Sequence, residues 1–336
     1  MKKILSILTV LLLTVTLTAC KKTESKPEGQ TVSVAHYVSM TDGSKNEQGE
    51  LVYTKKLVVE DFKISPERVV TYSLGVLDML DVVGVEKAGI KTLALPKSNL
   101  PTTLDTYKND KYPNAGTLFQ PTYDVLDIMN PELIILDGRT TNLYSTLKEK
   151  YPNANILDAS NTTYNLFNHI EIARNLSKIF PLVKDDIEKE MFDIVHDFTA
   201  IKKMTTQAKA LFILSNGTNI STSGKTGRYG VLFNEFGFIE ADENIGSGGS
   251  HGSLTGLEYI TKVNPDIIFI LDRAATIGNE SGLSNLLNEP QFKETNAYKN
   301  QHVYQLNGPA WYTVTGGFSS TKQMILDIMQ YINSLS

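Results

Sequence analysis

The sequence predicts an α/β protein made of two Rossmann-like lobes that are joined by one long helix. Apolar, β-type runs alternate with segments of helical periodicity along most of the 336 residues, which is typical of sheets covered by helices. The sequence NPELIILDGR at 130–139 has an echo, NPDIIFILDR, at 264–273. A periodic segment at 183–206 separates the two copies and would form a helix about 36 Å long. The repeat therefore indicates two halves of similar construction.

The N-terminus reads as a targeting segment rather than as part of the fold. Two lysines precede an apolar run at 4–17, which is too short for a good transmembrane helix. The Leu-Thr-Ala-Cys at 17–20 resembles the bacterial lipobox, so we expect residues 1–19 to be a signal peptide and Cys20 to be lipidated. Residues 20–30 are polar and without periodicity, and would tether the folded part to the membrane. An ordinary secretory signal with an incidental cysteine is the alternative.

Composition narrows the class of protein. With 41% hydrophobic and 21% charged residues, the chain is long enough for two domains with large cores. A net charge of −5 and the lack of a basic stripe argue against nucleic acid as a partner. Cys20 is the only cysteine, so one chain can build neither a disulfide nor a CxxC metal site. No histidines or carboxylates have the spacing of a zinc site, and we expect no intrinsic cofactor.

The first lobe is expected at 31–182. Two strand-like segments on either side of a polar, turn-rich stretch predict an edge hairpin at its start. Helices and strands then alternate, which predicts a parallel sheet with helices on both faces. We expect strands at 68–73, 130–139 and 155–157 and helices at 74–83, 122–129, 143–151 and 164–179.

The connecting helix at 183–206 is followed by a second lobe at 207–336. The apolar residues of the segment 183–206 recur at helical spacing, so we interpret this segment as a rigid connecting helix. The second lobe contains a glycine-rich loop at 244–253 and then the second copy of the repeat. Strands are expected at 211–214, 219–222 and 303–306, and helices at 229–237, 254–263, 283–287 and 319–335.

Arginines are scarce in this chain and lie at the ends of elements. The five arginines are Arg68, Arg139, Arg174, Arg228 and Arg273. Arg139 and Arg273 close the two repeated strands, and Arg228 lies in a loop before a helix. Ligands of open α/β sheets bind beyond the carboxyl ends of strands, so we expect these three guanidiniums to face one cleft. Their geometry suits carboxylate or catecholate oxygens, whereas surface arginines in weak salt bridges are the alternative.

One histidine and several aromatic residues are further candidates. His251 lies in the glycine-rich loop just before a helix, although a lone histidine is usually structural. Tyr312 lies beside Trp311 and before a Gly-Gly pair, and fits either core packing or the wall of the cleft. We include Tyr72, at the end of the strand at 68–73, and Trp311 among the candidate ligand-binding residues.

One motif points to an enzyme instead. Residues 248–252 fit G-x-S-x-G with Ser250 as the nucleophile, and Asp272 and His302 follow in the order of an α/β-hydrolase. That motif requires a strand immediately before it, whereas residues 242–247 do not read as one. We therefore expect no enzyme, and a lipid-anchored esterase that uses Ser250 is kept as an alternative.

These features together resemble the siderophore-binding lipoproteins of ABC importers, in particular the group that takes ferric catecholates and petrobactin-type siderophores. The features are the lipobox, the two lobes, the long helix and the loops GRYG at 227–230, SHG at 250–252, LDR at 271–273 and WY at 311–312. The likeness runs from about Arg68 to the C-terminus and is strongest in the second lobe. It implies the fold of a class III, or helical-backbone, substrate-binding protein.

The resemblance implies a role for each candidate residue. In that family arginines surround the anionic ferric complex, which implies this role for Arg139, Arg228 and Arg273. In members that bind tetradentate bis-catecholates, a histidine and a tyrosine complete the iron shell, which implies His251 and Tyr312 as ligands of Fe(III). A heme or cobalamin receptor of the same fold is the alternative.

The resemblance also implies partners and a location. We expect a non-enzymatic, monomeric receptor that carries Fe(III) only as part of a ferric siderophore. It would deliver this ligand to the permease and ATPase subunits of an ABC importer. The lipid on Cys20 would be its one attachment to the membrane, at the outer face of the bacterial cytoplasmic membrane.

Overall fold

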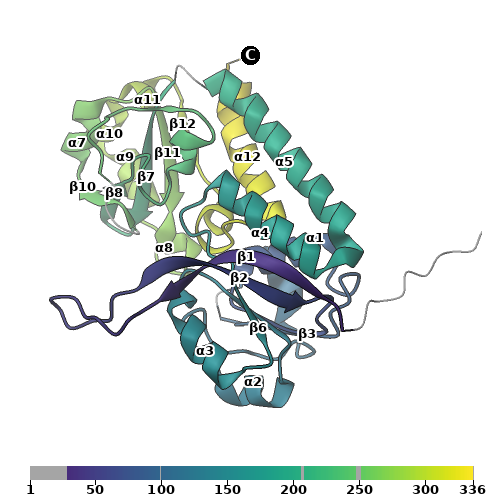
Figure 1. Cartoon of the computed structure of the whole chain (residues 1–336). Helices are drawn as coiled ribbons and strands as arrows, with labels where there is room; N and C mark the ends of the chain where they lie inside the picture. Colours follow the sequence, from purple (N-terminus) through teal and green to yellow (C-terminus); the bar gives the residue numbers. More distant parts are fainter. Residues whose placement is uncertain (1–28, 99, 206–207, 247–250, 336) are drawn as a thin grey trace, which may run out of the picture.

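The computed structural model describes residues 29–98, 100–205, 208–246 and 251–335. Two α/β lobes lie beside a layer of long helices (Figure 1). The predicted signal peptide, Cys20 and most of the tether lie outside the described residues. Within the described ranges, no helix is both long enough and apolar enough to cross a membrane.

An antiparallel hairpin lies across the N-terminal lobe. Strand β1 (Thr31–Met40) pairs with β2 (Thr54–Lys63) along the whole length of both strands. Val34, His36 and Val38 are buried and alternate with exposed residues, because successive side chains of a strand point to opposite faces. The loop between the two strands projects away from both lobes (Figure 1).

The N-terminal lobe contains the predicted parallel sheet. Its strand order is β4-β3-β5-β6, with β5 fully buried near the centre. The strands are β3 (Arg68–Thr71), β4 (Thr92–Ala94), β5 (Leu133–Leu136) and β6 (Asn155–Asp158). The helical segments of this lobe are α1 (Leu74–Val83), η1 (Thr102–Lys108), α2 (Tyr123–Met129), η2 (Thr141–Leu143) and α3 (Tyr144–Lys150). Strand β4 had no counterpart among the predicted strands.

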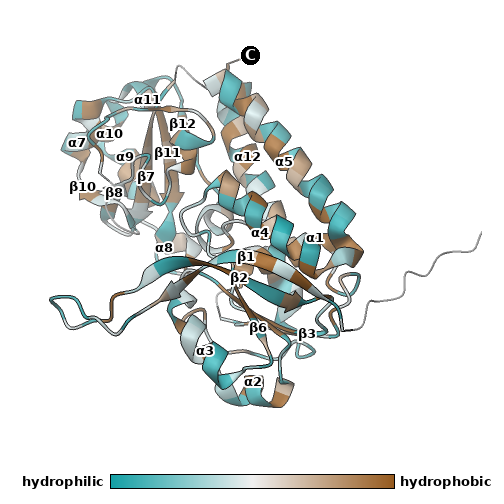
Figure 2. Ribbon diagram, in the orientation of Figure 1, coloured by the Kyte–Doolittle hydropathy of each residue, from teal (hydrophilic) through white to brown (hydrophobic). Residues whose placement is uncertain are grey.

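The long helix between the two sheets is α5 (Lys184–Thr205), which begins directly after η3 (Pro181–Val183). Helices α4 (Leu166–Ile179) and α12 (Phe318–Asn333) pack against it, and α1 packs against α12. The buried residues of α5 are apolar except Thr205, and its exposed residues are mostly polar, with Phe192 and Met204 as exceptions. Figure 2 shows teal and brown residues alternating along this helix. The predicted long helix is therefore confirmed, and it is part of a helical layer that contacts both lobes.

The sheet of the C-terminal lobe is mixed, whereas that of the N-terminal lobe is parallel. The strand order in the C-terminal lobe is β10-β8-β7-β11-β12, with β9 beside β7, and β8 runs antiparallel to both β7 and β10. The reason is the tight turn at Gly217, where φ is 64°, because a two-residue turn joins only antiparallel strands. The strands are β7 (Lys209–Asn216), β8 (Asn219–Thr222), β9 (Ile239–Glu240), β10 (Ser253–Thr255), β11 (Ile267–Asp272) and β12 (Val303–Gln305).

Short helices connect these strands. The helical segments are α6 (Val231–Asn234), α7 (Leu257–Val263), α8 (Arg273–Thr276), α9 (Leu283–Asn288), α10 (Pro290–Lys293), α11 (Asn296–Lys299) and η5 (Pro309–Thr313). The helix expected at 254–263 begins only at Leu257, because residues 253–255 pair with β8 as strand β10.

The repeated sequence has one structural explanation in both lobes. Asn130 ends α2 and Asn264 ends α7, each in the left-handed conformation with φ of 47° and 46°. Asparagine tolerates this conformation, and a proline that follows stops the helix. The apolar run then becomes β5 or β11, a central strand of its sheet. The repeat therefore brings Arg139 and Arg273 to equivalent sheet edges.

Candidate functional site

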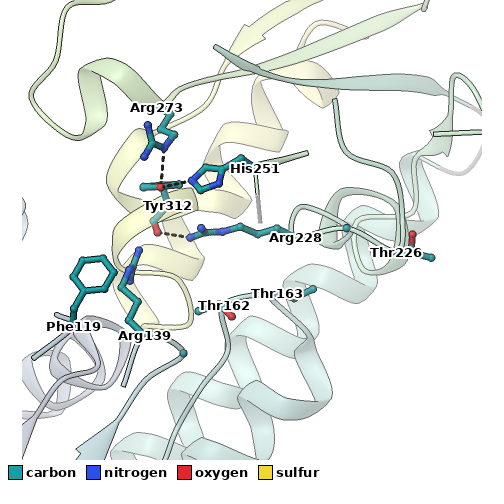
Figure 3. Close-up of a pocket in the computed structure, with 11 residues that line it drawn as sticks. Phe119, Arg139, Thr162, Thr163, Thr226, Arg228, His251, Arg273 and Tyr312 are labelled. Carbon is teal, nitrogen blue, oxygen red and sulfur yellow. Dashed lines mark hydrogen bonds between the residues drawn. The ribbon is translucent and has the colours of Figure 1, made fainter. Parts of the chain in front are cut away.

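A pocket of about 580 Å³ lies between the two lobes (Figure 3). One side is formed by the segment before α2 and the loops after β5 and β6. The other is formed by the loop after β8, by His251 just before β10, by the start of α8 after β11 and by η5. The carboxyl ends of β5, β6 and β11 therefore face the pocket, as is usual for ligand sites of α/β proteins. The lining residues are Phe119, Gly138, Arg139, Thr162, Thr163, Thr226, Gly227, Arg228, His251, Arg273 and Tyr312.

Tyr312 is the centre of a hydrogen-bonded group on the C-terminal side. Arg273 donates from Nε to the Tyr312 hydroxyl at 2.8 Å, and His251 Nε2 lies 3.2 Å from the same oxygen. Arg228 donates from Nη2 to the Tyr312 carbonyl at 2.7 Å, and its guanidinium carbon lies 4.4 Å from the centre of the ring. The guanidinium of Arg273 is also held by the side chain of Asn216, at 2.8 Å. Hydrogen bonds thus hold four predicted site residues beside one another, namely Arg228, His251, Arg273 and Tyr312 (Figure 3).

The three arginines of the pocket form no ion pair with an acidic residue in the described part of the chain. Within the described ranges, no Asp or Glu oxygen lies within 4.0 Å of a guanidinium nitrogen of Arg139, Arg228 or Arg273. The other two arginines, in contrast, form ion pairs with Glu132 and Glu171. Buried Nε of Arg228 has no hydrogen-bond partner among the described residues. Burial raises the pKa of Asp137, and the charges of Arg139 and Arg228 act against this rise, so the carboxyl lies near both guanidiniums. Three guanidiniums beside one carboxyl leave the pocket with an excess of positive charge, which suits an anionic ligand.

His251 is held in place by its backbone. The Ser221 hydroxyl donates to the His251 carbonyl, and strand β10 pairs with β8 just beyond. Gly252 has a φ of 81°, and a Cβ there would lie 2.3 Å from the Thr222 carbonyl oxygen. Burial, followed by the charges of the three arginines, lowers the pKa of His251. The imidazole is therefore neutral near pH 7 and able to bind a metal.

Arg139 lies across the pocket from this group and is less constrained. Its guanidinium carbon is 5.8 Å from the ring centre of Phe119, a cation–π arrangement. Phe119 is 63% exposed and follows Gly116, where φ is 116° and a Cβ would lie 2.3 Å from the Gln120 carbonyl oxygen. No periodic pattern in this loop singles out Phe119 as a site residue. The prolines and the glycine around it indicate only a turn.

The family of this protein follows from its similarity to known proteins. The model of the periplasmic binding protein family matches residues 69–310. This chain belongs to that family. The match covers both sheets, the long helix and every lining residue of the pocket except Tyr312.

Two relatives that are named for the siderophore they bind can be aligned with most of this chain. The petrobactin-binding protein YclQ of Bacillus subtilis is 32% identical over 290 residues, which are 85% of this chain and 89% of YclQ. The ferric-anguibactin-binding protein FatB of Vibrio anguillarum is 27% identical, over 79% of this chain and 82% of FatB.

Solved structures of similar proteins show the same fold. The crystal structure of YclQ superimposes with a TM-score of 0.72 at 30% identity, over 88% of this chain and 98% of YclQ. That of the catecholate-siderophore-binding protein VctP of Vibrio cholerae gives a TM-score of 0.73 at 27% identity, over 90% of this chain and all of VctP. The predicted helical-backbone fold is confirmed.

Two candidate ligand-binding residues of this periplasmic binding protein do not line the pocket. Tyr72 is 1% exposed and donates its hydroxyl to the Ala115 carbonyl at 3.0 Å, within the core of the N-terminal lobe. Trp311 is 2% exposed and donates Nε1 to Asp327 on α12 at 2.8 Å. Both rings pack in the interior and satisfy their polar atoms there, as buried aromatic residues with a polar handle do.

The hydrolase alternative gains no support from the described residues. Ser250 lies outside them. Asp272 accepts hydrogen bonds from the Ala275 N–H and the Ser281 hydroxyl, so it caps α8. The ring of His302 packs edge-on against Tyr331. Neither residue is among those that line the pocket.

Proposed function

We propose that this protein captures a ferric siderophore of the catecholate type in the pocket between its lobes and presents it to an ABC importer. The observation that carries the proposal is a group of three arginines around an adjacent phenol and imidazole, in which no guanidinium forms an ion pair with a described acidic residue. A ferric catecholate complex is anionic, and three guanidiniums in a partly desolvated pocket offset its charge. The ligands in the names of YclQ, FatB and VctP agree with this choice.

We further propose that His251 and Tyr312 complete the coordination of the bound iron. Fe(III) takes six ligands, and four catecholate oxygens of a tetradentate siderophore leave two positions open. Two donors about 2.1 Å from a metal and at right angles lie about 3 Å apart. The 3.2 Å between His251 Nε2 and the Tyr312 hydroxyl is compatible with such neighbouring positions. The hydrogen bond from Arg273 would hold the Tyr312 oxygen in position beside the bound iron.

Visible spectroscopy of a ferric bis-catecholate tests this proposal. Addition of the wild-type protein should shift the charge-transfer band of the complex, because two new donors enter the iron shell. Tyr312→Phe and His251→Ala should each bind with a different spectrum. Arg139→Ala is the control, since it should weaken binding and leave the spectrum of the bound complex unchanged. Unchanged spectra in both ligand variants would refute the coordination, while binding itself tests the class of ligand.

The attachment to the cell is a separate proposal. We infer that residues 1–19 are removed and that lipidated Cys20 holds the protein on the outer face of the cytoplasmic membrane. Mass spectrometry of the mature protein should find the acyl groups on Cys20, and Cys20→Ala should release or misprocess the protein. A mature N-terminus elsewhere would contradict the proposal.

A further inference from the structure

The N-terminal end of α12 is capped by a residue of the other lobe. Its N-cap residue is Gly317, which has no side chain that could accept a hydrogen bond from the first turn. Asp78, in the middle of α1, takes this role, because its Oδ2 accepts from the Ser320 N–H at 3.3 Å and its Oδ1 accepts from the Ser319 hydroxyl. Burial raises the pKa of Asp78, and these hydrogen bonds act against the rise. Asp78 is 2% exposed and is not among the residues that line the pocket.

Two glycines make this contact between the lobes possible. A Cβ at Gly317 would lie 2.0 Å from Oδ2 of Asp78, so only glycine leaves room there for the carboxyl group. On the facing helix, a Cβ at Gly75 would lie 2.6 Å from the Thr315 carbonyl oxygen. The backbone at 315–317 therefore lies directly against α1, and a larger residue at either glycine would push the two segments apart.

The capped turn lies at one end of the segment that carries Tyr312. Tyr312 belongs to η5 and lies five residues before the N-cap of α12. At the other end of this segment, Asp327 on α12 accepts from the Asn307 N–H at 2.7 Å and from Trp311 Nε1 at 2.8 Å. The segment 307–317 is thus held by two buried carboxyl groups, one from each lobe.

We propose that Asp78 is a positioning residue for Tyr312, through which the N-terminal lobe helps to hold the phenol in the pocket. This role rests on the proposed coordination of iron by the phenol. Arg228 and Arg273 hold Tyr312 from within the C-terminal lobe, through its carbonyl and its hydroxyl. Asp78 adds a contact from the opposite lobe. Its loss would release the first turn of α12, so we expect the phenol to shift away from the bound iron.

Binding of a tetradentate ferric bis-catecholate to Asp78→Ala tests this role. The affinity should fall about threefold to tenfold, and the charge-transfer band of the bound complex should shift toward that seen with Tyr312→Phe. When Tyr312→Phe is already present, Asp78→Ala should cause little further loss, because the donor that it positions is gone. Asp78→Asn should keep the wild-type affinity and spectrum, because the amide can accept from the Ser320 N–H and donate to the Ser319 hydroxyl.

Two further variants separate this role from a loss of stability. Asp81→Ala removes another acid of α1, which accepts from the Tyr107 hydroxyl within the N-terminal lobe, and it should leave the affinity and the spectrum unchanged. Ser319→Ala removes one hydrogen bond to Asp78 at an exposed position. It should cause a smaller shift of the spectrum in the same direction, and it keeps the test available if Asp78→Ala does not fold.

An equal loss of affinity in the presence and absence of Tyr312→Phe, with an unchanged spectrum, would overturn the positioning role, because Asp78 would then act on the fold alone. Wild-type binding and spectrum in Ser319→Ala, with Asp78→Ala either unchanged or unfolded, would overturn it as well. If Tyr312→Phe itself behaves like the wild type, the coordination of iron is refuted, and the role of Asp78 is refuted with it.

Discussion

The two sides of the pocket come from the same repeat but offer different chemistry. On the C-terminal side, Arg228, His251 and Arg273 all contact Tyr312 through hydrogen bonds. On the N-terminal side, the guanidinium of Arg139 contacts the exposed ring of Phe119. The repeat supplies one arginine at each strand end. The remaining groups come from loops outside the repeat, and they distinguish a side that would coordinate metal from a side that supplies charge and an aromatic surface.

The largest expected difference is between arginines of the two sides. Arg228→Ala and Arg273→Ala should each weaken binding of a ferric catecholate by about a hundredfold, because each removes a charge and a contact that positions Tyr312. Arg139→Ala should cost about tenfold, because only charge is lost. Titrations followed by fluorescence of Trp311, the only tryptophan, measure all three. Equal losses would mean that the sides are equivalent.

Substitution of one glycine on each side of the pocket would show how rigid the backbone is there. Gly252→Ala should displace His251 and destabilise the fold by about 1–3 kcal/mol, because φ is 81° and the new Cβ meets a backbone carbonyl at 2.3 Å. At Gly138 a Cβ would meet the side chain of Thr162, at 2.4 Å, and that side chain can rotate. Gly138→Ala should therefore cost less. Denaturant unfolding of both variants checks this order, which a more stable Gly252→Ala would reverse.

The pH dependence tests His251. The proposed coordination of iron by His251 would require the neutral ring, and the pKa of His251 is held below its ordinary value of 6.5 by burial and by the three arginines. The contribution of the imidazole should therefore persist as the pH falls through 6.5 and disappear only below the lowered pKa. The ratio of the dissociation constants of His251→Ala and the wild type isolates this contribution from protonation of the ligand. A ratio that falls already above pH 6.5 would contradict the lowered pKa.

The smallest effect on ligand binding is expected at Phe119, on the N-terminal side of the pocket. Phe119→Ala should weaken binding of ligands with aromatic rings about threefold to tenfold, because an exposed aromatic surface beside Arg139 is lost. Phe119→Tyr is the matched control and should bind like the wild type. Calorimetry with ferric catecholates and with a ferric hydroxamate distinguishes the two ligand classes. An equal loss for both would show that Phe119 does not select aromatic ligands.

The sequence was sufficient for features that local chemistry determines. Three features follow from caps and periodicity: the helix ends at Asn130 and Asn264, the buried strand after each of them, and the long helix. The meeting of Arg139 and Arg273 follows from the rule for strand ends, whereas Arg228 reaches the same pocket from a loop before a helix. His251 and Tyr312 required the resemblance, because a single histidine or tyrosine carries no periodic signal.

Other features depend on contacts that are distant in sequence. The turn at Gly217 makes β8 antiparallel to β7, and β10 then pairs antiparallel to β8. Tyr72 and Trp311 fit a pocket wall equally well until the packing of the core shows that both face inward. The cap that Asp78 provides for α12 is visible only once the packing of α1 against α12 is known.

The most direct test of iron coordination by Tyr312 compares the binding of two ferric complexes to one variant. A tetradentate ferric bis-catecholate leaves two iron positions for the protein, whereas a hexadentate ferric tris-catecholate leaves none. Titration of the wild type and Tyr312→Phe with both complexes should show binding of the tetradentate complex weakened by at least about tenfold in the variant, because one donor to iron is lost. Binding of the hexadentate complex should change little. Equal effects on the two complexes would contradict iron coordination by Tyr312.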